Sequence, residues 1–240
     1  MGDKMGSLFC EQYKTKAIQD VFKRRGVTRL CHMTEVENLL SILAEDSGVL
    51  ANVFLKEKRV YVNDTDRYDG RADYISTSIQ YPNVWYYNYK KNLNDWAIIF
   101  IDISICRRGN TLFSPVNAAT GKGAYLGVGV DSLKKSFDES VNGRIRNTNM
   151  LSCCPTDDQA EVMIYEEIPT SFISGIAFET MEAIERFTTE AIKMGIQCPN
   201  LYLAPELFTT SLSRKIRLGI EPEETIIKEG RIIWQKDLCS

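Results

Sequence analysis

The segment from residue 159 to residue 165 constrains the fold more than any other part of the chain. It reads Gln-Ala-Glu-Val-Met-Ile-Tyr and passes without a break from a polar loop into an apolar run. Apolar, β-branched and aromatic residues in such a short run are typical of a β-strand. Glu161 therefore stands at the mouth of a predicted strand. Taken alone, such a glutamate is most often a solvated carboxylate at the end of a loop.

The single histidine of the chain, His32, lies at the end of another short apolar run. Residues 28–31 are predicted to form a strand. Thr34 is predicted to begin a helix, because Glu37 three residues later completes a capping-box pattern. The helix would carry a regular apolar stripe, formed by Val36, Leu39, Leu40 and Leu43. Taken alone, such a histidine is more often a half-buried histidine with a structural partner.

The remaining pattern alternates strand-like and helix-like segments without repeats, low-complexity tracts or linkers, which predicts one mixed α/β domain with a core over about 28–208. Further strands are expected at 73–79, 97–103, 173–178 and 200–203, and helices at the N-terminus up to Gly26, near 131–139, and at 181–194 with Ile184, Phe187, Ala191 and Met194 on one face. Residues 56–73 are predicted to be a charged surface loop, most of 107–150 to be irregular, and the C-terminal residues to form a basic and then acidic tail.

Composition narrows the class of protein. In 240 residues, 44% are hydrophobic and 25% charged, as in ordinary globular proteins. No apolar run approaches the roughly 20 residues of a membrane helix, and residues 1–5 lack the apolar core of a signal peptide. The seven cysteines have no C-x-x-C spacing, which predicts reduced thiols in the cytoplasm and no zinc site, even at Cys153-Cys154. A net charge of −3 is not the signature of a nucleic-acid binder, although short basic clusters occur in the first two thirds of the chain.

Three polar segments lie between His32 and Glu161. They are residues 61–71, which contain Arg67 and Arg71, the strand residues Ser76-Thr77-Ser78, and Asn117-Ala118-Ala119.

Together with Cys31–Leu39 and Gln159-Ala160-Glu161, these segments resemble the DarT family of DNA-base ADP-ribosyltransferases, toxins of bacterial toxin–antitoxin pairs. The resemblance covers roughly residues 28–180. It implies an α+β, ADP-ribosyltransferase-like fold with a central mixed or antiparallel split sheet flanked by helices. It also implies NAD as the ADP-ribose donor, anti-phage defence as a setting, and a cognate antitoxin that reverses the modification.

The resemblance places the family's roles on particular residues. His32 would hold NAD, Glu161 would be the essential carboxylate, and Arg67 would support catalysis, with Arg71 as the alternative arginine. Other residues expected on the cofactor side are Thr34, Asn38, Ser76 and Ser78. The two serines are equally well explained as ordinary polar residues on a strand face.

These residue types suit the chemistry. Breaking the nicotinamide–ribose bond builds positive charge on the ribose, which a carboxylate stabilises. The same carboxylate can accept a proton from an attacking base nitrogen. The planar fork of an arginine matches the geometry of a pyrophosphate. The chain has no G-x-G-x-x-G, so a Rossmann site for NAD is not indicated.

The expected acceptor is single-stranded DNA. Residues 85–91 interleave aromatic and basic side chains, as a single-strand stacking surface would, and Trp85, Tyr86, Tyr87 and Lys90 are the residues expected to bind it. Gln159 stands where many ADP-ribosyltransferases contact the acceptor. A packed aromatic cluster is the alternative for 85–91, in which case the DNA groove would lie near Arg144 and Arg146.

Two other functions remain open at this stage. One is an enzyme that modifies a protein side chain or RNA instead of DNA, and the other is a nucleic-acid-binding module without turnover. The presence of His32, Arg67 and Glu161 weighs against the second.

Overall fold

Strand β4 (Trp96–Asp102) lies near the middle of a nine-stranded sheet in the computed structural model, which describes residues 15–44, 48–55, 68–90 and 95–227. Its sequence, Trp-Ala-Ile-Ile-Phe-Ile-Asp, is buried at every position except the last. A strand that is apolar on both faces needs cover above and below the sheet. Strand β4 therefore occupies the core, with β1 (Arg29–Glu35) on one side and β11 (Ile173–Phe178) on the other.

The strand order is β13-β12-β11-β4-β1-β3-β9-β5-β6. All neighbours are antiparallel except β11 and β12. The strands not yet bounded are β3 (Tyr74–Ile79), β5 (Leu112–Ser114), β6 (Gly127–Val128), β9 (Glu161–Tyr165), β12 (Asn200–Leu203) and β13 (Thr225–Ile227). Two small sheets pair β2 (Val49–Leu50) with β10 (Glu167–Ile168) and β7 (Ser140–Val141) with β8 (Arg144–Ile145).

The large sheet is split between β1 and β3. Strand β1 pairs with β4 at seven successive positions, but with β3 at only two, Leu30 opposite Ile79 and Cys31 opposite Ser78. Beyond Cys31 the two strands share no further pairing. We call this boundary the seam. The expected mixed, mostly antiparallel split sheet is therefore confirmed.

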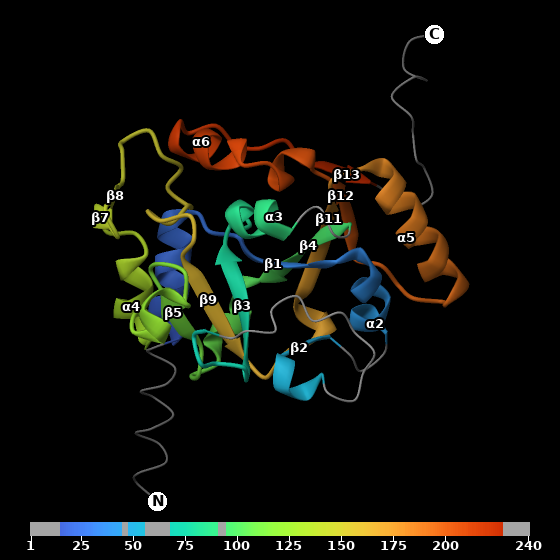
Figure 1. Ribbon diagram of the computed structural model, residues 1–240, viewed down its shortest axis with the longest axis horizontal. Coiled ribbons are helices and arrows are strands. Elements are labelled where there is room, and N and C mark those ends of the chain that lie inside the picture. Colours follow the sequence, from blue (N-terminus) through green and yellow to red (C-terminus); the bar gives the residue numbers. More distant parts are fainter. Residues whose placement is uncertain (1–14, 45–47, 56–67, 91–94, 228–240) are drawn as a thin grey trace, which may run out of the picture.

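Helices flank the sheet (Figure 1). They are a helix over residues 15–25, α2 (Leu39–Leu43), α3 (Val84–Lys90), α4 (Gly129–Lys135), α5 (Met181–Lys193) and α6 (Ser211–Arg217). Short 3-10 turns occupy Val36–Asn38, Asn52–Phe54, Ile103–Arg107, Thr120–Gly123, Thr170–Phe172 and Pro205–Phe208. Helix α5 is capped by Thr180, whose side chain accepts a hydrogen bond from Ala183 N.

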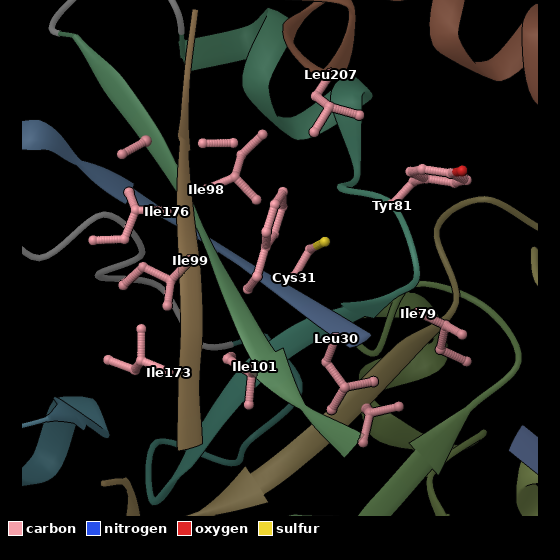
Figure 2. Close-up of a cluster of buried hydrophobic side chains, with 14 of the residues drawn as sticks. Leu30, Cys31, Ile79, Tyr81, Ile98, Ile99, Ile101, Ile173, Ile176 and Leu207 are labelled. Atoms are coloured by element: carbon pink, nitrogen blue, oxygen red, sulfur yellow. The ribbon is translucent and has the colours of Figure 1, made fainter. Parts of the chain in front are cut away.

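The main core gathers apolar side chains from β1, β4 and β11 and from the elements packed on them. Figure 2 shows part of this core, including Leu30, Ile99, Ile101 and Ile173. Leu207 of the turn after β12, and Leu212 and Ile216 of α6, belong to the same cluster. The C-terminal segments therefore pack on the sheet and do not form the loose tail that their charge pattern predicted.

The predicted helix start at Thr34 is wrong. Strand β1 continues to Glu35, which lies opposite Trp96, and Thr34 is buried within it. A 3-10 turn begins at Val36, and neither it nor α2 has a side-chain cap. Pairing with β4 supplies the backbone hydrogen bonds that a cap would otherwise provide, so the ladder prevails over the local signal.

Other expectations need smaller corrections. Residues 107–150 contain β5 to β8 and α4, which ends at Lys135 and not near 139. The aromatic segment after β3, to which the sequence assigned no secondary structure, is helix α3. On α5, Ile184, Phe187 and Ala191 are buried as expected, but Met194 is 60% exposed. Most of the expected loop at 56–73 lies outside the described residues.

The central position of β4 gives a stability prediction. Ile99 is fully buried, whereas Ile192 on α5 is 78% exposed. Ile99→Ala should lower the free energy of unfolding by about 2–5 kcal/mol, because it removes buried methyl groups and leaves a cavity. Ile192→Ala removes the same atoms from the surface and should change the free energy of unfolding by less than about 0.5 kcal/mol. Urea denaturation of both variants checks this, and equal losses would contradict the assignment of β4 to the core.

Candidate functional site

Glu161 is the first residue of β9 and lies in a row across three strands. It is directly opposite Ser78 of β3 on one side and Ser114 of β5 on the other. Directly opposed residues of antiparallel strands project from the same face of a sheet. Figure 1 shows β3 and β9 side by side at the centre of the molecule. The prediction that Glu161 begins a strand is confirmed.

The loop after β5 fixes the Glu161 carboxylate. Ala118 N donates a hydrogen bond to Oε2 at 2.8 Å, and Asn117 Nδ2 lies 3.5 Å from Oε1. The other end of the Asn117 amide, Oδ1, accepts a hydrogen bond from Ala119 N at 3.0 Å. Asn117 therefore folds its own loop and at the same time presents a donor to Glu161. The carboxylate is held in one orientation before any ligand binds, as catalysis by a preorganised charge requires.

His32 bridges the seam. It lies in β1, one residue beyond the last pair with β3, and its Nδ1 is 3.0 Å from the carbonyl oxygen of Ser76. Because a carbonyl oxygen only accepts, Nδ1 carries a proton. Ser76 is two residues from Ser78, which lies opposite Glu161, and this separation is roughly 7 Å along a strand. The structure thus brings His32 and Glu161, 129 positions apart in the sequence, to the same strand β3.

The other residues expected on the cofactor side divide into two pairs. Thr34 and Asn38 are both buried, and Asn38 Nδ2 donates to Thr34 Oγ1 at 3.2 Å. The pair joins the end of β1 to the start of α2. Ser76 is half-buried, with Oγ 3.4 Å from the sulfur of Met163, and Ser78 Oγ accepts a hydrogen bond from Asn83 N at 3.2 Å. Ser78 therefore also anchors the segment that leads into α3.

The two candidate arginines are not equally described. Arg67 lies outside the described residues. Arg71 is exposed, its guanidinium lies 6.0 Å from the centre of the Tyr74 ring, and it precedes β3 at the end opposite Ser78. Tyr74 and Ser78 are four residues apart, or roughly 13 Å along the strand. The fold thus places Arg71 at the far end of β3 from Glu161.

The aromatic segment separates into exposed and buried members of α3. Trp85 is 43% exposed, whereas Tyr87 is buried against Trp96 and Phe208. The Tyr87 hydroxyl donates to Glu179 Oε2 at 2.6 Å, and burial together with this bond raises the pKa of Tyr87. Tyr87 is thus packed in the core, as the alternative interpretation of this segment anticipated. The side chains of Tyr86 and Lys90 lie outside the described part of the structure.

Gln159 lies in a short loop that leads directly into Glu161. Its backbone N donates to Asp157 Oδ1 at 3.0 Å, and Ala160 N donates to the carbonyl oxygen of Asp157. Arg144 reaches the same loop, with Nε 3.3 Å from Asp157 Oδ1 and Nη1 3.6 Å from Asp158 Oδ1. We call residues 157–160 the acceptor loop, because Gln159 is the residue expected to contact the acceptor.

Arg146, the other arginine of the alternative groove, serves the adjoining segment. Its guanidinium donates to the carbonyl oxygens of Cys154, Leu151 and Ser152 at 2.7 to 3.2 Å. Its pKa is lowered by burial and by the neighbouring Arg25. Arg144 and Arg146 therefore both hold the chain that leads into Glu161.

Sequence reasoning assigned no role to Asn117, Ala118 or Asp158, although it singled out the segment 117–119. The signal for Asn117 was a polar residue in a loop, which is common to many surface turns. Asp158 carried no signal, because its partners come from three separate parts of the chain. Among the described residues, no group of three or more histidine, cysteine or acidic side chains is placed to hold a metal ion.

Comparison with known sequences defines the class of protein. The chain matches the family described as "ssDNA thymidine ADP-ribosyltransferase, DarT" over residues 31–209. This is about three quarters of its length, and it contains the seam, the Asn117 loop and Glu161. The chain therefore belongs to the DarT family of single-stranded-DNA thymidine ADP-ribosyltransferases. None of the curated proteins compared with the chain matches it.

Solved structures agree in fold. Thermus sp. 2.9 DarT in complex with ADP-ribosylated ssDNA has a TM-score of 0.55 and 13% identity, and the match covers 77% of this chain and 97% of that one. For the complex of the same protein with NAD+, the TM-score is 0.53 and the identity is 14%, and the match covers 76% of this chain and 98% of that one. For Thermosipho africanus DarTG in complex with ADP-ribose, the TM-score is 0.53 and the identity is 16%. The match covers 75% of this chain but only 51% of the Thermosipho chain. At these identities the likeness establishes the ADP-ribosyltransferase-like fold.

The contact between Asn117 and Glu161 yields a prediction. Asn117→Asp keeps the Oδ1 acceptor for Ala119 N but places a second carboxylate against Glu161. Loss of a donor to a charged group should lower ADP-ribosyl transfer roughly ten- to a hundredfold near neutral pH. Two adjacent carboxylates resist ionising together, so activity should recover as the pH rises.

The pH–rate profile of kcat for wild type, Asn117→Asp and Asn117→Ala checks this. Only the aspartate variant should show the acidic limb displaced to higher pH. Superimposable profiles for the three proteins would exclude a direct role for the Asn117 side chain at Glu161.

Proposed function

We propose that this chain breaks the nicotinamide–ribose bond of NAD and transfers ADP-ribose to the thymidine base of single-stranded DNA. The observation that supports this best is the Glu161 carboxylate, which stands at a strand start and is held by Ala118 N–H and the Asn117 amide. Membership of the DarT family supplies the reaction class and the acceptor.

The chemistry follows from the position of the carboxylate. As the bond between the ribose carbon and the nicotinamide nitrogen lengthens, nicotinamide leaves with the bonding electrons and the ribose gains oxocarbenium character. Glu161 stabilises this positive charge. A nitrogen of the thymine base then attacks the same carbon, and its proton passes to Glu161 or to solvent. No electrons are gained or lost overall.

The cofactor side is formed by the residues at the seam. With Nδ1 bound to the Ser76 carbonyl, His32 would contact NAD through Nε2, which fixes the pose of the cofactor. Thr34, Asn38, Ser76 and Ser78 would shape the same side from β1 and β3. Arg67 is our candidate for the arginine that supports catalysis. Arg71, at the far end of β3 from Glu161, is our candidate for binding the pyrophosphate.

The acceptor side is formed by Gln159 and Trp85. Gln159 is two residues before Glu161, and Trp85 is the exposed aromatic residue among those of α3 whose side chains are described. Tyr86 and Lys90 stay predicted members of this side. Tyr87 would contribute by supporting α3 from the core.

The biological setting is also a proposal. We propose that the chain acts as a toxin or anti-phage effector with a cognate antitoxin that removes the ADP-ribose, as the name of the Thermosipho DarTG relative suggests. No helix in the described part of the chain has the length and apolar character needed to cross a membrane. Cys31, Cys106, Cys153 and Cys154 are free thiols, which supports a reducing compartment such as the cytoplasm.

The test of the function is to find which molecules accept label from NAD. Wild-type protein incubated with NAD labelled in its adenylate part should transfer label to thymidine-containing single-stranded oligonucleotides. Mass spectrometry should place one ADP-ribose on the thymine base. Label only in protein or RNA from a cell extract would refute the DNA assignment, and no retained label with intact NAD would favour a binding module.

Glu161→Gln is the matched control for this experiment. The amide preserves the shape and can still accept the hydrogen bond from Ala118 N, but it removes the charge and the acceptor that faces Asn117 Nδ2. Transfer should therefore fall roughly a hundred- to a thousandfold, while the melting temperature stays close to that of wild type. Near-normal turnover in the folded variant would remove Glu161 from the mechanism.

His32→Ala should weaken NAD binding more than it reduces stability. His32 is half-buried, so loss of its hydrogen bond to the Ser76 carbonyl should lower the free energy of unfolding by only about 1 kcal/mol, whereas the proposed contact with NAD is lost altogether. Calorimetric titration of NAD into this variant, with thermal unfolding in parallel, measures both quantities. Unchanged NAD affinity with a large drop in melting temperature would assign His32 a purely structural role.

A further inference from the structure

Trp85 is tied to the Glu161 row from the β3 side. Ser78, opposite Glu161, accepts a hydrogen bond from Asn83 N, and Asn83 Oδ1 accepts one from Trp85 N at 3.2 Å. These bonds set the first turn of α3 against the end of β3. The backbone of Trp85 is thus fixed relative to the candidate catalytic carboxylate by two successive hydrogen bonds.

A second connection holds the indole ring itself. Trp85 Nε1 donates to Asp158 Oδ2 at 3.1 Å, and Ser213 Oγ donates to the same oxygen at 2.5 Å. The other oxygen, Asp158 Oδ1, accepts no hydrogen bond from the described residues and faces Arg144 Nη1 at 3.6 Å. Asp158 is next to Gln159 in the acceptor loop, so the edge of the indole is anchored beside the predicted acceptor-binding residue.

Helix α6 completes this arrangement. Besides Ser213, its residue Arg217 donates from Nη2 to the carbonyl oxygen of Thr156 at 3.1 Å, and Ile216 O accepts from Leu151 N. Figure 1 shows α6 and α3 toward the same edge of the molecule, and both pack on the turn Pro205–Phe208. The match to the family ends at residue 209, so α6 lies beyond it.

We propose that Trp85 is the face on which a base of the DNA strand stacks, and that Asp158 and Ser213 position it. This inference rests on the proposed function. It adds that the acceptor side of this chain depends on α6, an element outside the segment shared with the family. Asp158 and Ser213 are positioning residues, because they act through the indole and the acceptor loop and do not touch the reacting atoms.

The physical basis is the way in which the ring is held. An indole has one polar edge atom, Nε1, and anchoring that atom leaves the ring faces to receive a base. The 43% exposure of Trp85 contrasts with the 5% exposure of Trp96 and 6% of Tyr87, whose rings are enclosed by the core. Base stacking on an aromatic face is a main source of single-strand affinity. Fixing the ring before binding removes part of the entropy cost of association.

Charge also suits a DNA strand at this position. Arg144 is half-buried against Asp157 and Asp158, so the negative charge of the acceptor loop faces a guanidinium. Arg217 and Arg146 contact backbone carbonyls nearby, and no ion pair links either to a carboxylate within the described residues. The segment that leads into the acceptor loop is therefore held by three arginines, and two of them, Arg146 and Arg217, have no carboxylate partner among the described residues.

The experiment measures kcat, KM for a thymidine-containing oligonucleotide and KM for NAD in Trp85→Ala, Trp85→Phe and Ser213→Ala. Trp85→Ala should raise the oligonucleotide KM about five- to a hundredfold. Trp85→Phe keeps an aromatic face and loses only the tether, so its KM should rise by less than about tenfold. Ser213→Ala should raise it about two- to tenfold for the same reason. The KM for NAD should stay within twofold of wild type in all three.

Ser211→Ala is the matched control for Ser213→Ala. Ser211 lies on the same helix, is exposed, and hydrogen-bonds Thr209, which is not part of the acceptor loop. The KM of Ser211→Ala for the oligonucleotide should equal that of wild type. Quenching of intrinsic fluorescence by an oligonucleotide gives a second readout, because a stacked base quenches the exposed Trp85, and the signal should be lost in Trp85→Phe.

Two outcomes overturn the inference. One is an oligonucleotide KM for Trp85→Ala within twofold of wild type. The other is a Ser213→Ala variant in which the KM for NAD rises as much as the KM for the oligonucleotide. If wild type itself modifies no DNA while it still binds NAD in calorimetry, the proposed function fails, and this result is distinct from a failure of the stacking assignment.

Discussion

The short pairing between β1 and β3 is the constraint on which the site depends. Two positions join these strands, whereas seven join β1 to β4. Backbone groups freed by the divergence need other partners, because buried donors and acceptors are costly when unpaired. The Ser76 carbonyl finds one in His32 Nδ1. The histidine thus satisfies the sheet at the point where it opens, which is also where we propose that the cofactor binds.

The loop after β5 orients the carboxylate of a strand residue, Glu161. Strand β9 fixes the backbone of the glutamate between Ser78 and Ser114, but the direction of its carboxylate is set by Ala118 N–H and Asn117. The Asx turn at Asn117 holds that loop in shape. Rigid strand and local turn thus act together to preorganise the group that we propose faces the developing positive charge. The acceptor loop and α3 reach the same row through Gln159, Asp158 and Asn83.

Much of the fold could be predicted from the sequence, because strong periodic patterns reflect packing that occurs wherever the segment lies. Strands β3, β4, β9, β11 and β12, helix α5 and the helix ending at Gly26 follow such patterns. Two kinds of segment could not be predicted. Thr34 carries a good capping signal that pairing with β4 overrides, and the aromatic segment at 84–90 forms a helix because its buried face packs on the core. The charges near the C-terminus predicted a tail, although Leu212 and Ile216 in the same region form a buried stripe on α6.

The sequence by itself determined the chemistry-bearing residue types, the start of β9 at Glu161 and the family of the chain, since short motifs beside regular strands carry that information. Only the tertiary structure decided which residues meet. His32 and Glu161 both lie against β3, at Ser76 and Ser78, and Asn117 turns back onto Glu161. Asp158 contacts Trp85, Ser213 and Arg144, which come from separate segments. Contacts between distant residues depend on strand order and loop path, and the closure of long loops leaves no local pattern in the residues that they bring together.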